Sequence, residues 1–219
     1  MKILSIDAFN EKLKINPINA SDIDELGFYE FFPKDKYELK ETIKERMNKD
    51  GMNCDLNMIN TSSIKDFSYL FEKISEFNGD LSRWNTSKAY DMSHMFEGCS
   101  QFNCNISSWD VSNVKNMSRM FSGCKKFNQN LNDWNVSNVK YMDGMFAACF
   151  DFDQPLDKWH DKLHNVISMR TMFYNCHSFN QDLSSWIIST DKTNTYDMFV
   201  SSHHIHYNVI DREHMPKFI

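Results

Sequence analysis

Four cysteines recur at one position of a repeating sequence pattern, and they are the residues whose chemistry needs to be considered first. Stacked thiols could bind a metal ion or react with one another. Zinc sites, however, use ligand pairs two to four residues apart, and the sequence contains no Cys-x-x-Cys. Cysteine is also among the residue types most often buried, so we expect this column to be a structural part of the core. Its members are Cys99, Cys124, Cys149 and Cys176.

A histidine cluster near the C-terminal end is the best candidate for a metal site. It lies in the last and least regular repeat, where ligands would be poorly held. The amides and carboxylates that follow the recurring phenylalanines lack the dense acidic spacing that calcium prefers. We therefore expect no metal site and no cofactor. The histidines are His203, His204, His206 and His214.

Catalytic templates are missing from the sequence. It contains no phosphate-binding glycine-rich loop, no His-Glu-x-x-His and no Gly-x-Ser-x-Gly. Packing accounts for the periodic residues, and the remainder offers no combination of nucleophile, base and orienting group. We predict that the protein is not an enzyme. An effector whose activity resides in residues 1–34 or in the histidine-rich tail is a further alternative.

Composition and charge exclude several classes of protein. The 219 residues are 41% hydrophobic, which is enough for a buried core. A net charge of −6 and the lack of a basic block argue against a nucleic-acid partner. No apolar run is long enough for a membrane span. The apolar stretch at the start is interrupted by Asp7 and is too short for a signal peptide. These features predict a cytoplasmic protein with free thiols, and a surface or secreted protein is the alternative.

The tryptophans reveal an internal repeat. All five lie in one column, separated by 25, 25, 25 and 27 residues, and pairs of methionine and phenylalanine recur at nearly the same step. Such self-similarity is typical of repeat architectures, in which each unit covers the apolar face of the next. We expect the tryptophan and cysteine columns to form a structural ladder inside the stack. The tryptophans are Trp84, Trp109, Trp134, Trp159 and Trp186.

Each repeat shows the patterns of one short helix and one short strand. Apolar residues three or four apart from Val114 to Cys124 predict one face of a helix, either an α-helix or a tighter single turn, with Ser112 as its N-cap. Apolar residues separated by Asn and Asp from Phe127 to Val136 predict a strand. The fold class that follows is α/β, a right-handed leucine-rich-repeat-type solenoid of about six rungs with an N-terminal helical cap.

Three regions are expected along the chain. Residues 1–50 form an N-terminal cap region with an amphipathic helix over 35–50, in which apolar residues recur every four positions and Gly51 ends the helix. Residues 51–200 form the six-rung stack. Residues 201–219 form a C-terminal cap or tail.

The repeat unit carries a family resemblance. Phe127-Asn128-x-x-Leu131-x-x-Trp134-Asn135-Val136-Ser137-Asn138-Val139-x-x-Met142-x-x-Met145-Phe146-x-x-Cys149 resembles the repeat of the BspA-like leucine-rich repeat surface proteins. The resemblance covers about residues 36–200. It implies a surface or secreted protein, of bacteria or some protists, that acts in attachment and protein binding.

A non-enzymatic protein–protein interaction module is the function that these observations favour. Solenoids bind partners through variable polar side chains that a rigid frame presents in register. A surface adhesin or structural protein exported without a visible signal is the alternative, and the sequence leaves the partner and the oligomeric state open. The predicted binding residues are Arg83, Asp133 and Lys158 on the strand side, and Arg119 and Arg170 on the helix side.

Overall fold

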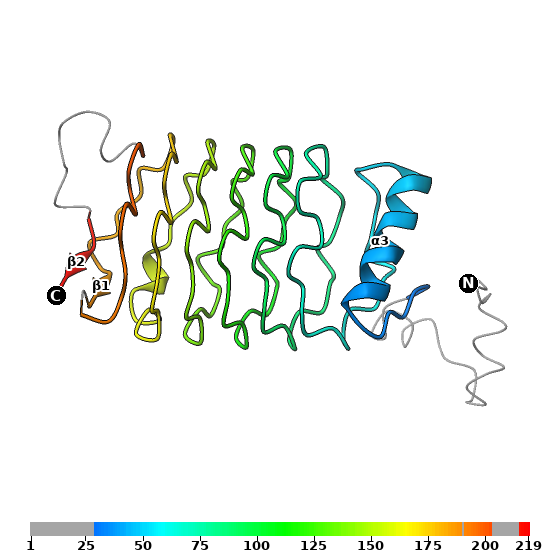
Figure 1. Cartoon of the computed structure of the whole chain (residues 1–219), viewed down its shortest axis with the longest axis horizontal. Coiled ribbons are helices and arrows are strands. Elements are labelled where there is room, and N and C mark those ends of the chain that lie inside the picture. Colours follow the sequence, from blue (N-terminus) through cyan, green and yellow to red (C-terminus); the bar gives the residue numbers. More distant parts are fainter. Residues whose placement is uncertain (1–28, 190, 203–214) are drawn as a thin grey trace.

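The chain folds into a stack of similar turns, as seen in a computed structural model that describes residues 29–189, 191–202 and 215–219. Successive turns lie side by side between a helix at one end and two short strands at the other (Figure 1). We call each turn of the stack, about 25 residues long, a coil. The helices and strands are α3 (Lys36–Asp50), the 3₁₀ turn η1 (Asp157–Trp159), β1 (Ile187–Ile188) and β2 (Lys217–Phe218).

Isolated parallel bridges join each coil to the next. One column of bridges runs through almost the whole stack, with a single residue of each coil paired to its equivalent in the neighbour. Among the described residues only β1 and β2 extend beyond a single bridge, and they pair in parallel over two residues each. Residues about 25 positions apart in sequence are therefore direct neighbours in space. The column consists of Asp66, Asp91, Asn116, Tyr141, Ser168 and Asn194.

The predicted α/β solenoid of the leucine-rich-repeat type is wrong. Among the described residues the coils contain neither a repeating strand nor a repeating α-helix, and α3 is the only α-helix. In the segment expected to be helical, the N–H groups of Met117 and Phe121 donate to Tyr141 and Met145 of the next coil, at 2.9 and 3.0 Å. An α-helix would instead use those groups for bonds four residues back in the same segment.

Left-handed backbone conformations explain why no helix forms. Arg119 and Gly123 have φ of 55° and 77°, and the equivalent residues of the other coils are likewise positive. Two such residues in each coil interrupt any right-handed helix while keeping the apolar residues on one side. The apolar side chains point to one side, as they would on a helix. The backbone instead makes a series of tight turns, with a left-handed residue at every fourth position.

The predicted N-cap and strand are also corrected. The N–H of Ser112 donates to Oδ1 of Asp110 at 3.0 Å, which is an Asx turn rather than the start of a helix. The Phe127 to Val136 segment contains turns, such as the bond from the N–H of Trp134 to the carbonyl of Leu131 at 3.0 Å. Most of the bridges lie instead in the column that includes Asn116. In segments equivalent to residues 127–136, Asp80 pairs with Asp55, Ile59 pairs with Phe31, and β1 pairs with β2.

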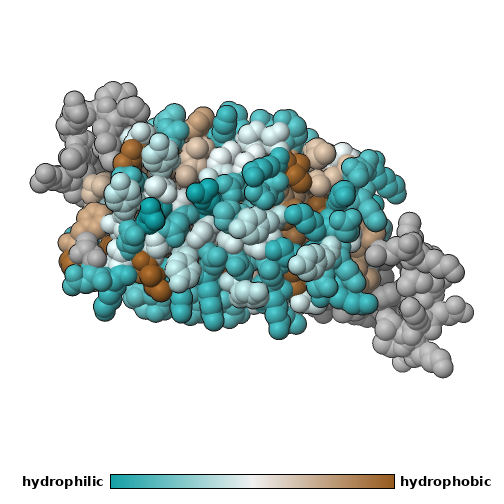
Figure 2. Space-filling view, in the orientation of Figure 1, coloured by the Kyte–Doolittle hydropathy of each residue, from teal (hydrophilic) through white to brown (hydrophobic). Residues whose placement is uncertain are grey.

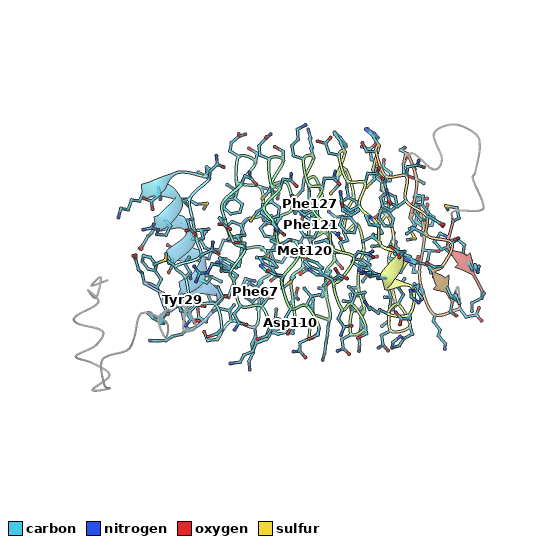
Figure 3. The ribbon with its side chains drawn as sticks, turned by 180° about the vertical axis from the view of Figure 1, so that it is seen from behind. Tyr29, Phe67, Asp110, Met120, Phe121 and Phe127 are labelled. Atoms are coloured by element: carbon cyan, nitrogen blue, oxygen red, sulfur yellow. The ribbon has the colours of Figure 1, made fainter. Side chains whose placement is uncertain are left out.

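The interior is a continuous aromatic stack. Phe121 packs against Phe127 of its own coil, with ring centroids 4.1 Å apart, and against Phe96 and Phe146 of the neighbouring coils at 5.8 Å. Figure 3 shows Phe121, Phe127 and Met120 between the two sides of the coils. Because each ring is covered from both sides, the core has no boundary between one coil and the next.

Helix α3 covers one end of this interior. Asp35 caps it by accepting hydrogen bonds from the N–H groups of Tyr37 and Glu38, and Gly51 ends it at φ 88°. Leu39 and Ile43 are fully buried against the first coil. The predicted cap residues 1–28 and most of the predicted C-terminal cap, residues 203–214, lie outside the described residues.

Candidate functional site

Each coil has two polar sides with different hydrogen bonding. The Met–Phe segments (91–99, 116–124, 141–149 and 168–176) bond to the next coil through backbone groups at every second residue. The Trp segments (80–89, 105–114, 130–139 and 157–166) have fewer such bonds and depend on side chains. This difference decides which polar side chains remain available for a partner.

Tryptophan side chains join the Trp segments across coils. Each indole Nε1–H donates to the carbonyl of the Leu or Ile column one coil earlier, for example from Trp134 to Ile106 at 3.3 Å and from Trp159 to Leu131 at 3.1 Å. Asn138 adds a bond from Nδ2 to the carbonyl of Ser112 at 2.7 Å. Trp84, Trp109 and Trp186 donate in the same way.

The cysteine column is buried and makes hydrogen bonds. Sγ of Cys149 donates to the carbonyl of Phe121 at 2.9 Å, and Cys99, Cys124 and Cys176 make the equivalent bond. Burial raises the pKa of Cys99 and of Cys176 to about 12. Neutral thiols at ordinary pH are poor nucleophiles and poor metal ligands, which assigns the column to packing.

Side-chain amides after the phenylalanines hold turns together. The N–H of Asn128 donates to Oδ1 of Asn103 one coil earlier at 2.9 Å, and the N–H of Asp153 donates to Oδ1 of Asn128 at 3.0 Å. These oxygens are therefore engaged by backbone donors. In the described ranges no three His, Cys, Asp or Glu residues are grouped so as to hold a metal ion. The histidine cluster from His203 to His214 lies outside those ranges.

The predicted binding residues on the Trp segments are exposed charged side chains. Lys158 pairs with Asp133, with Nζ and Oδ1 2.7 Å apart, at an exposed position. The hydrogen bond from Lys158, together with its charge, lowers the pKa of Asp133. Arg83 is exposed in the same column, two coils before Asp133. Two of these three charges are thus engaged with each other.

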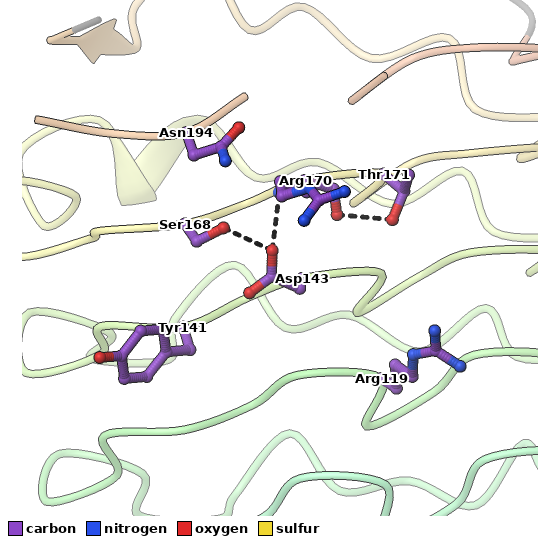
Figure 4. Close-up of a pocket in the computed structure, with 7 residues that line it drawn as sticks. All are labelled: Arg119, Tyr141, Asp143, Ser168, Arg170, Thr171 and Asn194. Carbon is purple, nitrogen blue, oxygen red and sulfur yellow. Dashed lines mark hydrogen bonds between the residues drawn. The ribbon is translucent and has the colours of Figure 1, made fainter. Parts of the chain in front are cut away.

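Arg119 and Arg170, by contrast, line one shallow hollow of about 500 Å³. They come from Met–Phe segments two coils apart, and Asp143 of the coil between them lies in the hollow (Figure 4). Oδ1 of Asp143 accepts a hydrogen bond from the Ser168 hydroxyl and one from the N–H of Arg170, the latter at 3.2 Å. The remaining lining residues are Tyr141, Thr171 and Asn194.

Both guanidinium groups of the hollow retain free donors. Nη1 of Arg119 lies 3.2 Å from Oε1 of Glu97, while the Arg119 side chain is 58% exposed. The guanidinium of Arg170 lies over the ring of Tyr196, 5.7 Å from its centroid. Because a guanidinium has five N–H donors, each arginine could bind a further acceptor.

Lysines extend the positive charge along the stack. Lys115 and Lys140 are exposed residues in adjacent coils, and the N–H of Lys140 donates to the carbonyl of Lys115 at 2.9 Å. Neither lysine forms an ion pair with another residue in the described part of the chain. We call the surface that comprises Lys115, Lys140, Arg119, Arg170 and Tyr141 the basic face.

Sequence reasoning identified only part of the basic face. It singled out Arg119 and Arg170 but missed Tyr141, Lys115 and Lys140. The recurrence of lysine at Lys115 and Lys140, 25 residues apart, was a usable signal. No such signal marked Tyr141, because other residue types occupy its column in the neighbouring coils.

The rest of the visible surface offers no large apolar site. On the side of the stack shown in Figure 2, hydrophilic residues predominate and hydrophobic residues form small separate groups. In the part of the chain that the structure describes, no helix combines the length and the apolar composition needed to cross a membrane. Charged and aromatic side chains are therefore the main candidates for recognition.

Comparison with known proteins identifies a family. Residues 38–159 and 106–212 match the model of a family described as Mycoplasma protein of unknown function, DUF285. No curated protein and no solved structure matches the chain. The two overlapping matches run from residue 38 to residue 212, well over half of the sequence. The repeat chain with its tryptophan ladder and basic face therefore belongs to the DUF285 family.

Proposed function

We propose that the protein is a non-enzymatic protein-binding module and that the basic face makes the contact. The observation that carries this proposal is the hollow in which Arg119 and Arg170 flank Asp143, beside an exposed Tyr141. Arginine and tyrosine are enriched at the energetic centres of protein interfaces, because both combine a large contact area with directional hydrogen bonding.

Rigidity of the supporting backbone also favours this surface. The N–H of Arg119 donates to the carbonyl of Asp143 at 2.8 Å, and the N–H of Gly144 donates to the carbonyl of Arg170 at 2.7 Å. The backbone that carries the side chains of the basic face is therefore held by backbone hydrogen bonds, which do not involve those side chains. A frame of this kind limits the entropy lost on binding.

Affinity capture with the full chain tests the proposal. Bait carrying Arg119→Ala and Arg170→Ala is compared with wild-type bait and with bait carrying Arg83→Ala and Lys158→Ala. The control variant also removes two positive charges, but from the Trp segments. We expect a specific protein to be captured by the wild type and the control and lost only with the first variant. Urea unfolding of all three baits verifies that each is folded.

Two outcomes would overturn the assignment. Equal capture by all three baits would exclude the hollow as the contact surface. Loss of capture with the Arg83→Ala and Lys158→Ala bait alone would move the contact to the Trp segments.

A surface adhesin of the BspA-like kind is the second candidate function. It is supported by the resemblance of the repeat from Phe127 to Cys149, and the DUF285 match is compatible with a bacterial surface repeat protein. Fractionation of cells that produce the native protein, followed by protease treatment of intact cells, tests it. An adhesin is degraded by protease added outside, whereas an internal binding module is protected.

A further inference from the structure

We propose that the basic face binds an extended acidic segment of a partner protein, which runs along the stack and places one carboxylate between Arg119 and Arg170. This inference deepens the proposed function and rests on it. It concerns the class of partner, which is defined here by charge, spacing and the nature of the anion.

The charge of the basic face is opposite to that of the whole chain. The chain carries a net charge of −6, whereas the basic face combines two arginines and two lysines. Of the carboxylates nearby, Glu97 pairs with Arg119, and Asp143 accepts hydrogen bonds from Ser168 and from the N–H of Arg170. The neutral donors leave the charge of Asp143 in place, so the four cations and these two carboxylates together have two positive charges in excess, which complements an acidic segment.

The spacing of the cations fits an extended chain. Parallel neighbours in a bridge lie about 4.8 Å apart, so Arg119 and Arg170, which are two coils apart, are separated by about 10 Å along the stack. An extended peptide advances about 3.3 Å per residue, so about three residues cover that distance. Lys115 and Lys140, one coil apart, add cations along the same direction. Because successive side chains of an extended chain point to opposite faces, acidic residues an even number of positions apart would present their carboxylates to this array.

Carboxylates fit the hollow better than phosphates do. Arg119 already binds the Glu97 carboxylate at 3.2 Å, which shows that this anion fits its guanidinium. The carboxylate of Asp143 lies between the arginines and would repel a phosphate dianion more strongly than a single negative charge.

Tyr141 gives the surface a second kind of contact. Its ring is 41% exposed beside the hollow, and Lys140 precedes it directly. An apolar or aromatic side chain next to the bound carboxylate would pack on this ring. Tyrosine loses little conformational entropy on binding, because its side chain has only two rotatable angles. The expected partner segment therefore combines acidic residues with apolar ones and is not a uniform acidic tract.

Fluorescence anisotropy with defined probes tests the inference on the full chain. The probe is a fluorescein-labelled, amidated peptide in which Glu-Thr-Val-Thr is repeated three times, so that Glu and Val share one face of the extended chain, and its control has Gln in place of Glu. A labelled single-stranded oligothymidylate of similar length represents a phosphate polymer. We expect the Glu peptide to bind about tenfold more tightly than the Gln peptide, with an affinity that falls as salt is added.

Variants locate the binding. Arg119→Ala with Arg170→Ala should weaken binding of the Glu peptide by about tenfold, whereas Arg83→Ala with Lys158→Ala should leave it unchanged within about twofold. Equal affinities for the Glu and Gln peptides, tighter binding of the oligothymidylate, or equal effects of the two double variants would each overturn the inference.

Failure of this inference can be told apart from failure of the proposed function. A partner captured by the wild type and lost with Arg119→Ala and Arg170→Ala would keep the protein-binding role even when the Glu peptide does not bind. In that case only the acidic class of partner is wrong.

Discussion

The two sides of each coil achieve the same stacking by different means. On the Met–Phe side, backbone groups bond to backbone groups of the next coil, as from Phe96 to Met120 at 2.9 Å. On the Trp side, side chains complete the bonding, as from the Nε1–H of Trp109 to the carbonyl of Leu81 at 3.1 Å. A side chain that holds two coils together cannot be replaced to suit a binding partner without a loss of stability. The Met–Phe side is therefore better suited to carry a binding surface.

Trp134→Phe tests this difference with the largest expected effect. The substitution removes the donor to the Ile106 carbonyl and leaves a cavity beside the smaller ring, so we expect a loss of about 2 to 4 kcal/mol in the free energy of unfolding. Met145→Leu on the Met–Phe side is a volume-conserving change at a buried position, removes no hydrogen-bond donor and should cost less than about 1.5 kcal/mol. Urea unfolding gives both values, and equal losses would remove the contrast.

The cysteine column refines the comparison, because it is one of the places where the Met–Phe side also uses side chains to join coils. Burial raises the pKa of Cys99 to about 12, whereas an unfolded thiol titrates near about 8.5. A raised native pKa gives stability that is complete below the unfolded pKa and is lost as the pH rises toward the native value. The stability contributed by Cys99 should therefore fall from about pH 8 upward.

Urea unfolding at about pH 8 and at about pH 10 measures this loss. Wild-type protein should lose about 1 to 2 kcal/mol more between the two values than Cys99→Ala does, since the two proteins differ only in this thiol. Cys104→Ala, which removes a half-buried thiol, is the control and should show a smaller difference. An identical loss in wild type and Cys99→Ala would contradict the raised pKa.

Two neighbouring alanines test the backbone of the Met–Phe side. Ala148 has φ of 57°, while Ala147 is not among the described residues with positive φ. Glycine adopts the left-handed region without the steric cost that a Cβ brings, so Ala148→Gly should stabilise the protein by about 0.5 to 1 kcal/mol. Ala147→Gly should destabilise it by a similar amount, because only the unfolded chain gains freedom. Shifts of the same sign in both variants would refute the left-handed turn.

The period of the stack could be predicted from the sequence, but the conformation of each coil could not. The spacing of the five tryptophans and of the Met-Phe pairs indicates stacked repeats, and Gly51 marks the end of α3. Apolar residues from Val114 to Cys124 have helical spacing, yet left-handed residues such as Arg119 give the same alternation without a helix. A polar residue such as Asp110 before that segment suits an Asx turn as well as an N-cap.

The candidate site was predictable only in part, because its two arginines occupy different positions of the repeat. Arg119 directly precedes Met120, whereas Arg170 stands two residues before Met172, so the two arginines occupy different columns. The coil that contains Arg170 has two extra residues between its tryptophan and the next one. Only the folded chain shows that Arg170 lies beside Asp143, whose carboxylate accepts its N–H.

Two matched double variants test most directly whether side-chain hydrogen bonds hold the Trp segments together, because one pair makes such bonds and the other pair lies directly before the Met–Phe segments. Asn113 and Asn138 bond through Nδ2 to the carbonyls of Ser87 and Ser112, at 2.8 and 2.7 Å, whereas Lys115 and Lys140 stand two residues further on in each coil. In urea unfolding, Asn113→Ala with Asn138→Ala should lose about 1 kcal/mol, and Lys115→Ala with Lys140→Ala should change by less than about 0.5 kcal/mol. Equal losses, or a larger loss for the lysine pair, would contradict the account.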